Sequence, residues 1–227
     1  MDALILADGE APSRGELDRA WPGWDTDLGL VIAADGGARH AARLAVAIDA
    51  WVGDGDSLDA EGIAALVAAG VSIQRARPDK DESDTELAVR EALRRGATGL
   101  VIVGALGGAR IDHALANIGL LAMAELSGRP AALIDARSRI TLVRAPDPDG
   151  APVHRPLPGR IGDLISLLPM GPGVSGVTTR GLAYPLLDEP LPEGFARGLS
   201  NERAAPDAAV TVRAGLLLVV ESPRLEP

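Results

Sequence analysis

Two acidic clusters in this sequence contain the residue types that bind a divalent metal ion. They are Gly53-Asp54-Gly55-Asp56-Ser57 and Asp79-Lys80-Asp81-Glu82-Ser83-Asp84. Each follows an apolar run typical of a buried strand. At an effective dielectric of 20, two carboxylates about 5 Å apart repel each other by roughly 3 kcal/mol, so a converging cluster needs a cation or raised pKa values. Mg²⁺ is the expected cation, because it takes oxygen ligands and shares itself with substrate phosphates. The alternative is that each acid is only a loop residue or a helix cap.

The single lysine of the chain, Lys80, lies inside the second cluster, whereas the sequence has 21 arginines. A compact ammonium on a flexible side chain can contact a phosphate oxygen where a planar guanidinium would not fit. This contrast favours a functional role for Lys80. The alternative is a solvated loop lysine.

Two further segments carry polar groups suited to phosphates. The Asp35-Gly36-Gly37 turn offers backbone amides and little side-chain bulk to a phosphate or ribose, although an ordinary tight turn needs the same residues. Arg110, Asp112 and His113 combine a cation for phosphate, a possible ligand and a ring that can carry a proton. The alternative for Asp112 is a helix N-cap, with His113 on the helix surface.

All four segments lie at predicted junctions between a strand and a helix. Apolar runs and helix-period segments alternate over residues 1–135, which is typical of a parallel sheet with helices on its faces. In open α/β sheets ligands bind beyond the carboxyl ends of the strands, so the four segments can line one crevice. The predicted strands are Ala3 to Ala7, Leu30 to Ala34, Ala50 to Val52, Val71 to Gln74, Leu100 to Val103 and Ala131 to Ile134. The predicted helices are Ala38 to Leu44, Glu61 to Ala69, Asp84 to Arg95 and His113 to Leu126.

The helix after the second cluster is the best specified by its sequence. Ser83 and Glu86 form a capping-box pattern, and Gly96 can end the helix in the left-handed conformation. Asp84 therefore lies in the first turn, where free amides and the helix dipole favour carboxylates and bound phosphates.

A change of composition near residues 145–160 predicts a domain boundary. The prolines and glycines of this segment are poorly tolerated in regular elements. We therefore expect an N-terminal α/β domain with a mostly parallel, Rossmann-like sheet at residues 1–145, a proline-rich linker at 146–159, and a C-terminal all-β antiparallel sandwich at 160–227. The strands expected in the sandwich are Leu164 to Leu168, Val174 to Thr179, Ala209 to Val212 and Leu216 to Val220.

Composition and charge argue against several classes of protein. Of 227 residues, 47% are apolar, which is ample for a packed core. A formal charge of −10 and only five aromatic residues disfavour nucleic-acid binding. The lack of cysteine excludes disulfide and thiolate chemistry. No signal-peptide pattern or long apolar run is visible, so we expect a cytoplasmic protein with no membrane partner.

The order of the motifs resembles that of the thiamine pyrophosphokinase family. It runs Asp-Gly-Gly, Gly-Asp-x-Asp-Ser, Lys-Asp-x-x-Asp-Thr-Glu and a Gly-rich Arg-x-Asp-His, carried here by the segments around Asp35, Asp54, Lys80 and Arg110. The resemblance covers nearly the whole chain, because it continues through three later landmarks. These are Gly181-Leu182-Ala183-Tyr184-Pro185-Leu186, Ser200-Asn201-Glu202 and Gly215-Leu216-Leu217-Leu218-Val219.

The resemblance implies a reaction and an assembly. The reaction is transfer of pyrophosphate from ATP to the hydroxyl of thiamine, giving thiamine diphosphate and AMP, by Mg²⁺-assisted in-line attack on the β-phosphorus. The N-terminal domain would be catalytic and bind ATP and metal. The β-sandwich would bind thiamine and form a homodimer with active sites between subunits.

The resemblance also implies roles for individual residues. It assigns metal binding and catalysis to Asp54, Asp56 and Asp84, with Asp84 or Asp56 as the preferred base. ATP would be contacted by Asp35, Gly36, Gly37, Ser57, Arg110, Asp112 and His113. The substrate side would be formed by Lys80, Asp81, Tyr184, Ser200 and Asn201.

Two residues depart from the family pattern. Gly55 stands where the family usually has a bulky aromatic residue, and Ala109 interrupts or replaces a glycine before Arg110. Neither change removes a carboxylate, so we expect an effect on affinity or substrate preference before a loss of activity.

Three other functions stay open. A pyrophosphokinase acting on a pterin alcohol would share the catalytic half, but the C-terminal landmarks disfavour it. A haloacid-dehalogenase-like enzyme would use Asp54 as a covalent nucleophile, but its motif normally follows the first strand rather than the third. A catalytically silent nucleotide-binding sensor would not need every acid at the four junctions.

Overall fold

The computed structural model describes residues 1–77 and 79–224, and the chain divides into two compact units. Unit 1 is Met1–Ala136 and unit 2 is Arg137–Pro227. The boundary thus comes earlier than predicted. The reason is that β7 (Arg139–Ala145) pairs along its length with β13 (Ala214–Ser222) of unit 2.

The segment predicted as a linker, 146–159, is part of unit 2. It contains β8 (Val153–Pro156), which pairs antiparallel with β12 (Ala209–Val212). Because β8 ends the strand order of its sheet, proline is tolerated there without a missing ladder hydrogen bond. The proline-rich composition therefore marks a turn and an edge strand, and the linker prediction is wrong.

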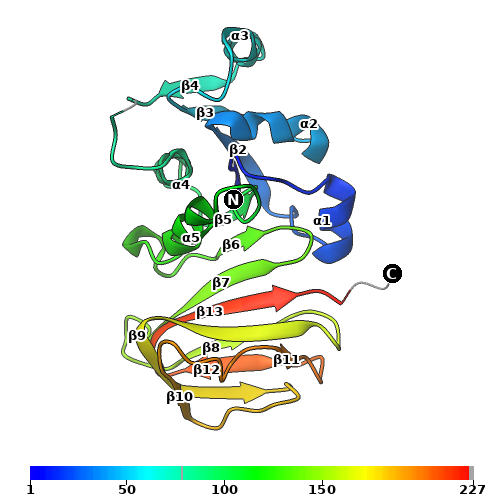
Figure 1. Cartoon of the computed structure of the whole chain (residues 1–227), viewed down its shortest axis with the longest axis vertical. Coiled ribbons are helices and arrows are strands. Elements are labelled where there is room, and N and C mark those ends of the chain that lie inside the picture. The colour runs from blue at the N-terminus through cyan, green and yellow to red at the C-terminus, as the bar shows by residue number, and fades with distance from the viewer. Residues whose placement is uncertain (78, 225–227) are drawn as a thin grey trace. The chain divides into compact units, whose positions relative to one another are not determined.

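The sheet of unit 1 consists of parallel strands in the order β4-β3-β2-β1-β5-β6 (Figure 1). The strands predicted in the first half are confirmed, with small shifts at their ends. The order reverses at β1, because β2 lies on one side of it and β5 on the other. A crevice for ligands forms at the carboxyl ends of strands at such a point. The bounds are β1 (Asp2–Leu6), β2 (Leu28–Ala34), β3 (Ala50–Gly53), β4 (Ser72–Arg75), β5 (Gly99–Val103) and β6 (Ala131–Ile134).

Helices connect these strands. One of them, α1, was not predicted, although Ser13 and Glu16 form a reciprocal capping box at its start. No helix in the described part of the chain is long and apolar enough to cross a membrane. The bounds are α1 (Arg14–Ala20), the 3₁₀ helix η1 (Asp35–His40), α2 (Ala41–Leu44), α3 (Ala60–Ala68), α4 (Asp84–Arg94), α5 (Ile111–Leu120) and the 3₁₀ helix η2 (Ala124–Leu126).

Helix α4 begins at Asp84 as predicted and ends at Arg94, one residue before the predicted end. The Ser83 hydroxyl accepts a hydrogen bond from the Glu86 amide at 3.1 Å, and Gly96 adopts a φ of 87° just beyond the helix. The Glu86 carboxylate accepts hydrogen bonds from Arg90, so only one half of the capping box is seen among the described residues. The buried face of α4 packs on β1, β2 and β3, and this packing fixes the position of its first turn.

Unit 2 is built from antiparallel strands in the order β7-β13-β9-β12-β8. The two strands predicted at Leu164 to Leu168 and Val174 to Thr179 are one strand, β9 (Leu164–Arg180), which pairs first with β13 and then with β12. Glycines with positive φ at Gly171, Gly173 and Gly176 allow this change of partner. A C-terminal β region is confirmed, and its description as a sandwich is still a prediction. The short strands β10 (Glu189–Leu191) and β11 (Asn201–Glu202) also pair with β9.

Candidate active site

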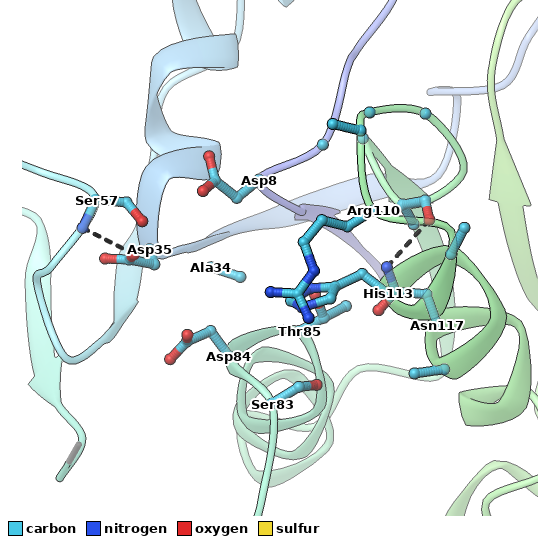
Figure 2. Close-up of a pocket in the computed structure, with 18 of the residues that line it drawn as sticks. Asp8, Ala34, Asp35, Ser57, Ser83, Asp84, Thr85, Arg110, His113 and Asn117 are labelled. Atoms are coloured by element: carbon cyan, nitrogen blue, oxygen red, sulfur yellow. Dashed lines mark hydrogen bonds between the residues drawn. The ribbon is translucent and has the colours of Figure 1, made fainter.

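A cavity of about 600 Å³ lies in unit 1 where the strand order reverses (Figure 2). Residues that follow β1, β2, β3 and β5 line it together with the first turn of α4. This is the place where open α/β sheets bind ligands. The sequence-predicted site residues in its lining are Asp35, Asp56, Ser57, Lys80, Asp84, Arg110 and His113.

The other predicted residues of unit 1 are absent from this lining, as far as the described residues show. Each of two of them accepts a hydrogen bond from a residue of the lining: Asp54 from Lys80, and Asp112 from Arg110. Asp81 is an exposed residue of the loop before α4. Gly36 and Gly37 are buried in the first turn of η1.

Asp35 is the most constrained carboxylate of the cavity. Its side chain is buried and its φ is 44°, a left-handed conformation that Asp tolerates better than most residues. The indole N–H of Trp51 donates to the Asp35 carbonyl at 2.9 Å, and the Ser57 amide donates to its Oδ2 at 3.3 Å. A Cβ on Gly53 would lie 2.9 Å from the Asp35 Cβ, so glycine is required there for this close approach.

The surroundings of Asp35 disfavour its charge. Burial raises the pKa of the Asp35 carboxyl, and the negative charges of Asp84 and Asp56 act in the same direction. Its Oδ1 is buried without a hydrogen-bond partner among the described residues. Oxygen atoms of Asp35, Asp54 and Asp56 all lie within 4.8 Å of one another. This donor set fits a hard divalent cation, which would relieve the repulsion and use the unpaired oxygen.

Lys80 lies between two of the predicted metal ligands. Its Nζ is 3.3 Å from Asp54 Oδ2 and 3.1 Å from Asp84 Oδ1. Burial lowers the pKa of Lys80, but the hydrogen bonds and charges of Asp84 and Asp54 outweigh it, so the net pKa is raised. The pKa of Asp54 is lowered, mainly by a hydrogen bond from the Asp56 amide and also by Lys80, although burial acts in the opposite direction. The ammonium therefore partly neutralises the acidic cluster.

The Asp35-Gly36-Gly37 turn packs tightly against the end of β1. A Cβ on Gly36 would lie 2.2 Å from Asp8 Oδ1, and one on Gly37 would lie 2.0 Å from the Leu6 carbonyl oxygen. Gly37 is therefore needed to bring the start of η1 onto β1 and so to place Asp35, because a Cβ there would meet backbone. The atoms nearest to Gly36 belong to the side chains of Asp8 and Arg39, which can move. The contact of Gly36 and Gly37 with ATP stays a prediction.

Arg110 and His113 line the cavity from the start of α5, on the side opposite Asp35 and Asp84 in the view of Figure 2. The Arg110 guanidinium donates its Nε–H to Asp112 Oδ1 at 3.1 Å. This hydrogen bond lowers the pKa of Asp112 to about 2. Arg110 itself occupies the N-cap position and Asp112 lies in the first helical turn, so Asp112 orients Arg110 rather than capping the helix.

Asp8 and Asn117 also line the cavity, although neither was predicted from the sequence. Asp8 forms an ion pair with Arg39. It was detectable, because an Asp-Gly pair directly follows the first predicted strand, as it does at Asp35. The buried Asn117 donates to the Ala105 carbonyl at 3.0 Å and ties α5 to the loop after β5. Only the packing of α5 reveals this residue.

The unusual Gly55 has a local explanation. Its φ of 87° is left-handed, so any other side chain would be strained there. A Cβ at this position would lie 3.4 Å from Arg75 Nη1 and 3.8 Å from Trp51 Cη2. In this chain the loop therefore depends on glycine, whereas an aromatic residue would require another loop conformation.

The three predicted substrate residues of unit 2 lie together. Asn201 is buried, accepts a hydrogen bond from the Tyr184 amide at 2.9 Å and donates to the Tyr184 carbonyl at 2.6 Å. The Ser200 amide donates to Ser166 Oγ at 3.1 Å. Tyr184 is 64% exposed. Asn201 thus holds the backbone that presents the Tyr184 ring.

Comparisons with known proteins point to the same family for both halves of the chain. The family described as thiamin pyrophosphokinase, catalytic domain, matches residues 25–132. The family described as thiamin pyrophosphokinase, vitamin B1 binding domain, matches residues 153–217. The thiamine pyrophosphokinase of Bacillus subtilis (strain 168) is 26% identical over 170 residues, which are 75% of this chain and 76% of that relative.

Solved structures of similar fold extend over both units. The crystal structure of thiamine pyrophosphokinase from Bacillus subtilis has a TM-score of 0.82 at 24% identity and covers 99% of this chain and 100% of its own. A thiamin pyrophosphokinase family protein from Enterococcus faecalis has a TM-score of 0.79 at 26% identity, with 99% and 100% covered. The yeast thiamin pyrophosphokinase has a TM-score of 0.76 at 17% identity, with 97% and 86% covered. Because both domain families match in order and together span most of the sequence, this chain belongs to the thiamine pyrophosphokinase family.

Proposed function

We propose that this chain transfers pyrophosphate from ATP to the hydroxyl of thiamine, giving thiamine diphosphate and AMP. The observation that carries the proposal is the cavity at the strand reversal, where carboxylates converge with Arg110 and His113. Membership of the thiamine pyrophosphokinase family supports the same reaction. In-line attack by an alcohol on the β-phosphorus requires alignment and charge neutralisation more than covalent help, which suits this set of side chains.

We assign Mg²⁺ as the cofactor, held by Asp54, Asp56 and Asp84 as the sequence predicts. Asp35 joins this set in our proposal, because its buried Oδ1 is unpaired among the described residues and lies near oxygens of Asp54 and Asp56. When bound, the ion supplies neutralisation of the phosphate charge. The protein holds the carboxylates in place through Trp51 and the hydrogen bonds of the loop after β3.

We assign some of the remaining residues to nucleotide binding and others to proton transfer. The Arg110 guanidinium and the His113 ring are assigned to the phosphates of ATP, with Asp112 orienting Arg110. Asp84 or Asp56 would accept the proton of the attacking hydroxyl. The ATP contacts of Asp35, Gly36, Gly37 and Ser57 and the substrate contacts of Lys80 and Asp81 belong to the same proposal.

We assign thiamine binding to unit 2. The exposed ring of Tyr184 suits stacking on a cationic thiazolium, and Ser200 and Asn201 lie beside it. The homodimer rests on the family resemblance, and it completes the proposal together with the Rossmann-like and sandwich descriptions and the cytoplasmic location, which rest on the sequence pattern.

An AMP-release assay tests the proposed function. It compares thiamine, pterin alcohols and no acceptor, each with ATP and Mg²⁺, for the unaltered protein and for Asp54→Asn. We expect thiamine-dependent AMP release that falls at least about 10²-fold in the variant, because a metal ligand is lost. Asp27→Asn is the matched control, because that exposed carboxylate lies far along the chain from the acidic clusters.

The other outcomes identify the alternatives. AMP release with a pterin alcohol but not with thiamine would replace the proposed acceptor. ATP binding by calorimetry without AMP formation in any reaction would favour the nucleotide-binding sensor. A phosphorylated Asp54 trapped during turnover would favour the covalent dehalogenase-like chemistry.

A further inference from the structure

The only lysine of the chain makes contacts expected of a metal ion. Its Nζ lies within 3.3 Å of one carboxylate oxygen of Asp54 and one of Asp84. These carboxylates come from two different segments, the loop after β3 and the first turn of α4. The Lys80 side chain is 13% exposed, so these contacts are partly shielded from water. Lys80 therefore bridges two residues that we assign to metal binding.

The contacts of Lys80 compete with metal binding. A carboxylate oxygen that accepts a hydrogen bond from an ammonium has less capacity to coordinate a cation, and the ammonium also repels that cation. Lys80 also lines the cavity in which we place the phosphates of ATP. Its flexible side chain can turn from a carboxylate to a phosphate oxygen without losing an anionic partner.

We propose that Lys80 is an exchangeable internal cation, which holds Asp54 and Asp84 together in the metal-free protein and transfers to the nucleotide phosphates when metal and ATP bind. This inference rests on the proposed function, because it assumes the same metal and nucleotide site. Its consequence is a preferred order of binding. The nucleotide-free protein binds the metal weakly, and the metal enters together with ATP.

Metal binding to Lys80→Gln tests the inference without measuring activity. Mn²⁺ is the probe, because it accepts the oxygen ligands of Mg²⁺ and is detected by electron paramagnetic resonance. Without nucleotide, we expect Lys80→Gln to bind Mn²⁺ about tenfold more tightly than the unaltered protein, as a partly screened competing charge is removed. With the non-reactive ATP analogue that has a methylene between the α- and β-phosphorus, we expect about tenfold weaker binding of the Mn²⁺ complex, because the phosphate contact is lost.

Two further variants separate this role from a general effect on the loop. Arg77→Gln removes the same charge from the same segment, but Arg77 is 83% exposed and pairs with Asp79, so neither affinity should change. Lys80→Arg keeps the charge, and its Mn²⁺ affinity without nucleotide should stay near that of the unaltered protein. With the ATP analogue, Lys80→Arg should bind the Mn²⁺ complex more weakly, because a planar guanidinium does not replace the ammonium at the phosphate. Unchanged binding of that complex would contradict the exchange even if Lys80→Gln fails to fold, which thermal unfolding of each variant detects.

The two expected changes in Mn²⁺ affinity of Lys80→Gln have opposite signs, tighter without nucleotide and weaker with the ATP analogue. A structural role for Lys80 would weaken both affinities in Lys80→Gln, and that result would overturn the exchange. Unchanged Mn²⁺ binding in Lys80→Gln, alongside a loss in Asp54→Asn, would overturn the exchange but keep the proposed metal site. Absence of Mn²⁺ binding to the unaltered protein in the presence of the ATP analogue would overturn both.

Discussion

Replacing the buried Asp35 by asparagine should stabilise the metal-free protein while it removes metal binding. The pKa of Asp35 is raised by burial and by neighbouring carboxylates, so the folded protein holds this proton more tightly than the unfolded chain. The ionised carboxylate therefore costs stability at neutral pH. Asparagine tolerates the left-handed backbone, and its oxygen can still accept the Ser57 amide hydrogen bond. The carboxylate that we propose as a metal ligand is thus kept at the expense of stability.

The expected gain follows from the distances in the cluster. Two unit charges 4.8 Å apart repel by about 0.9 kcal/mol at a dielectric of 80 and by about 3.5 kcal/mol at 20. Because Asp56 is exposed and Lys80 offsets part of the charge, we expect the lower part of this range, about 1 to 2 kcal/mol. For a chain of this length that gain raises the unfolding temperature by about 3 to 6 °C.

Thermal unfolding with and without Mg²⁺ is the assay. At pH 7 without metal, Asp35→Asn should unfold at a higher temperature than the unaltered protein, and the difference should shrink as the pH falls toward 3.8, the ordinary value for Asp. Saturating Mg²⁺ should raise the unfolding temperature of the unaltered protein but not that of Asp35→Asn. The exposed Asp27→Asn serves as the control. A variant that is less stable than the unaltered protein at pH 7 without metal would refute the reasoning.

Three further changes test other parts of unit 1. The hydrogen bond from Arg94 lowers the pKa of Glu91 and outweighs the opposite effect of burial. Glu91→Gln should therefore lower the free energy of unfolding by about 1 kcal/mol at pH 7, as measured by urea unfolding. That cost should disappear as the pH falls below 4.5, because the carboxylate of the unaltered protein then becomes protonated. Gly37→Ala places a Cβ 2.0 Å from the Leu6 carbonyl and should destabilise the protein by about 3 kcal/mol in the same assay. Arg110→Gln should raise the KM for ATP about tenfold in steady-state kinetics, and an unchanged KM would remove Arg110 from the nucleotide site.

The strands of unit 1 were predictable because their signals are local. Buried parallel strands are short apolar runs, and helices between them have their own period and caps, so residues such as Ser83 and Gly96 reveal a helix directly. Helix α1 carried an equally local signal in Ser13 and Glu16 and could have been found. In unit 2 the sequence was misleading, because proline marks an edge strand as well as a linker and glycine marks a bend within a strand as well as its end.

In the candidate site, too, local sequence signals were readable and contacts between distant segments were not. The motif order indicated the family and seven of the residues that line the cavity, because each motif lies at the end of its own strand. The partners of those residues could not be read from the motifs. Three contacts join segments that are separated in the chain: the ion pair of Lys80 with Asp54, the hydrogen bond from Trp51 to the Asp35 carbonyl, and the hydrogen bond from Asn117 to the Ala105 carbonyl.

The sequence alone therefore determined which residue types stand at the ends of which strands, since that information resides in neighbouring residues. The tertiary structure alone decided which carboxylate is buried, which is paired and which carries a raised pKa. Burial and charge interactions depend on distances between segments, and those distances exist only after the strands have ordered around β1 and α4 has packed across them.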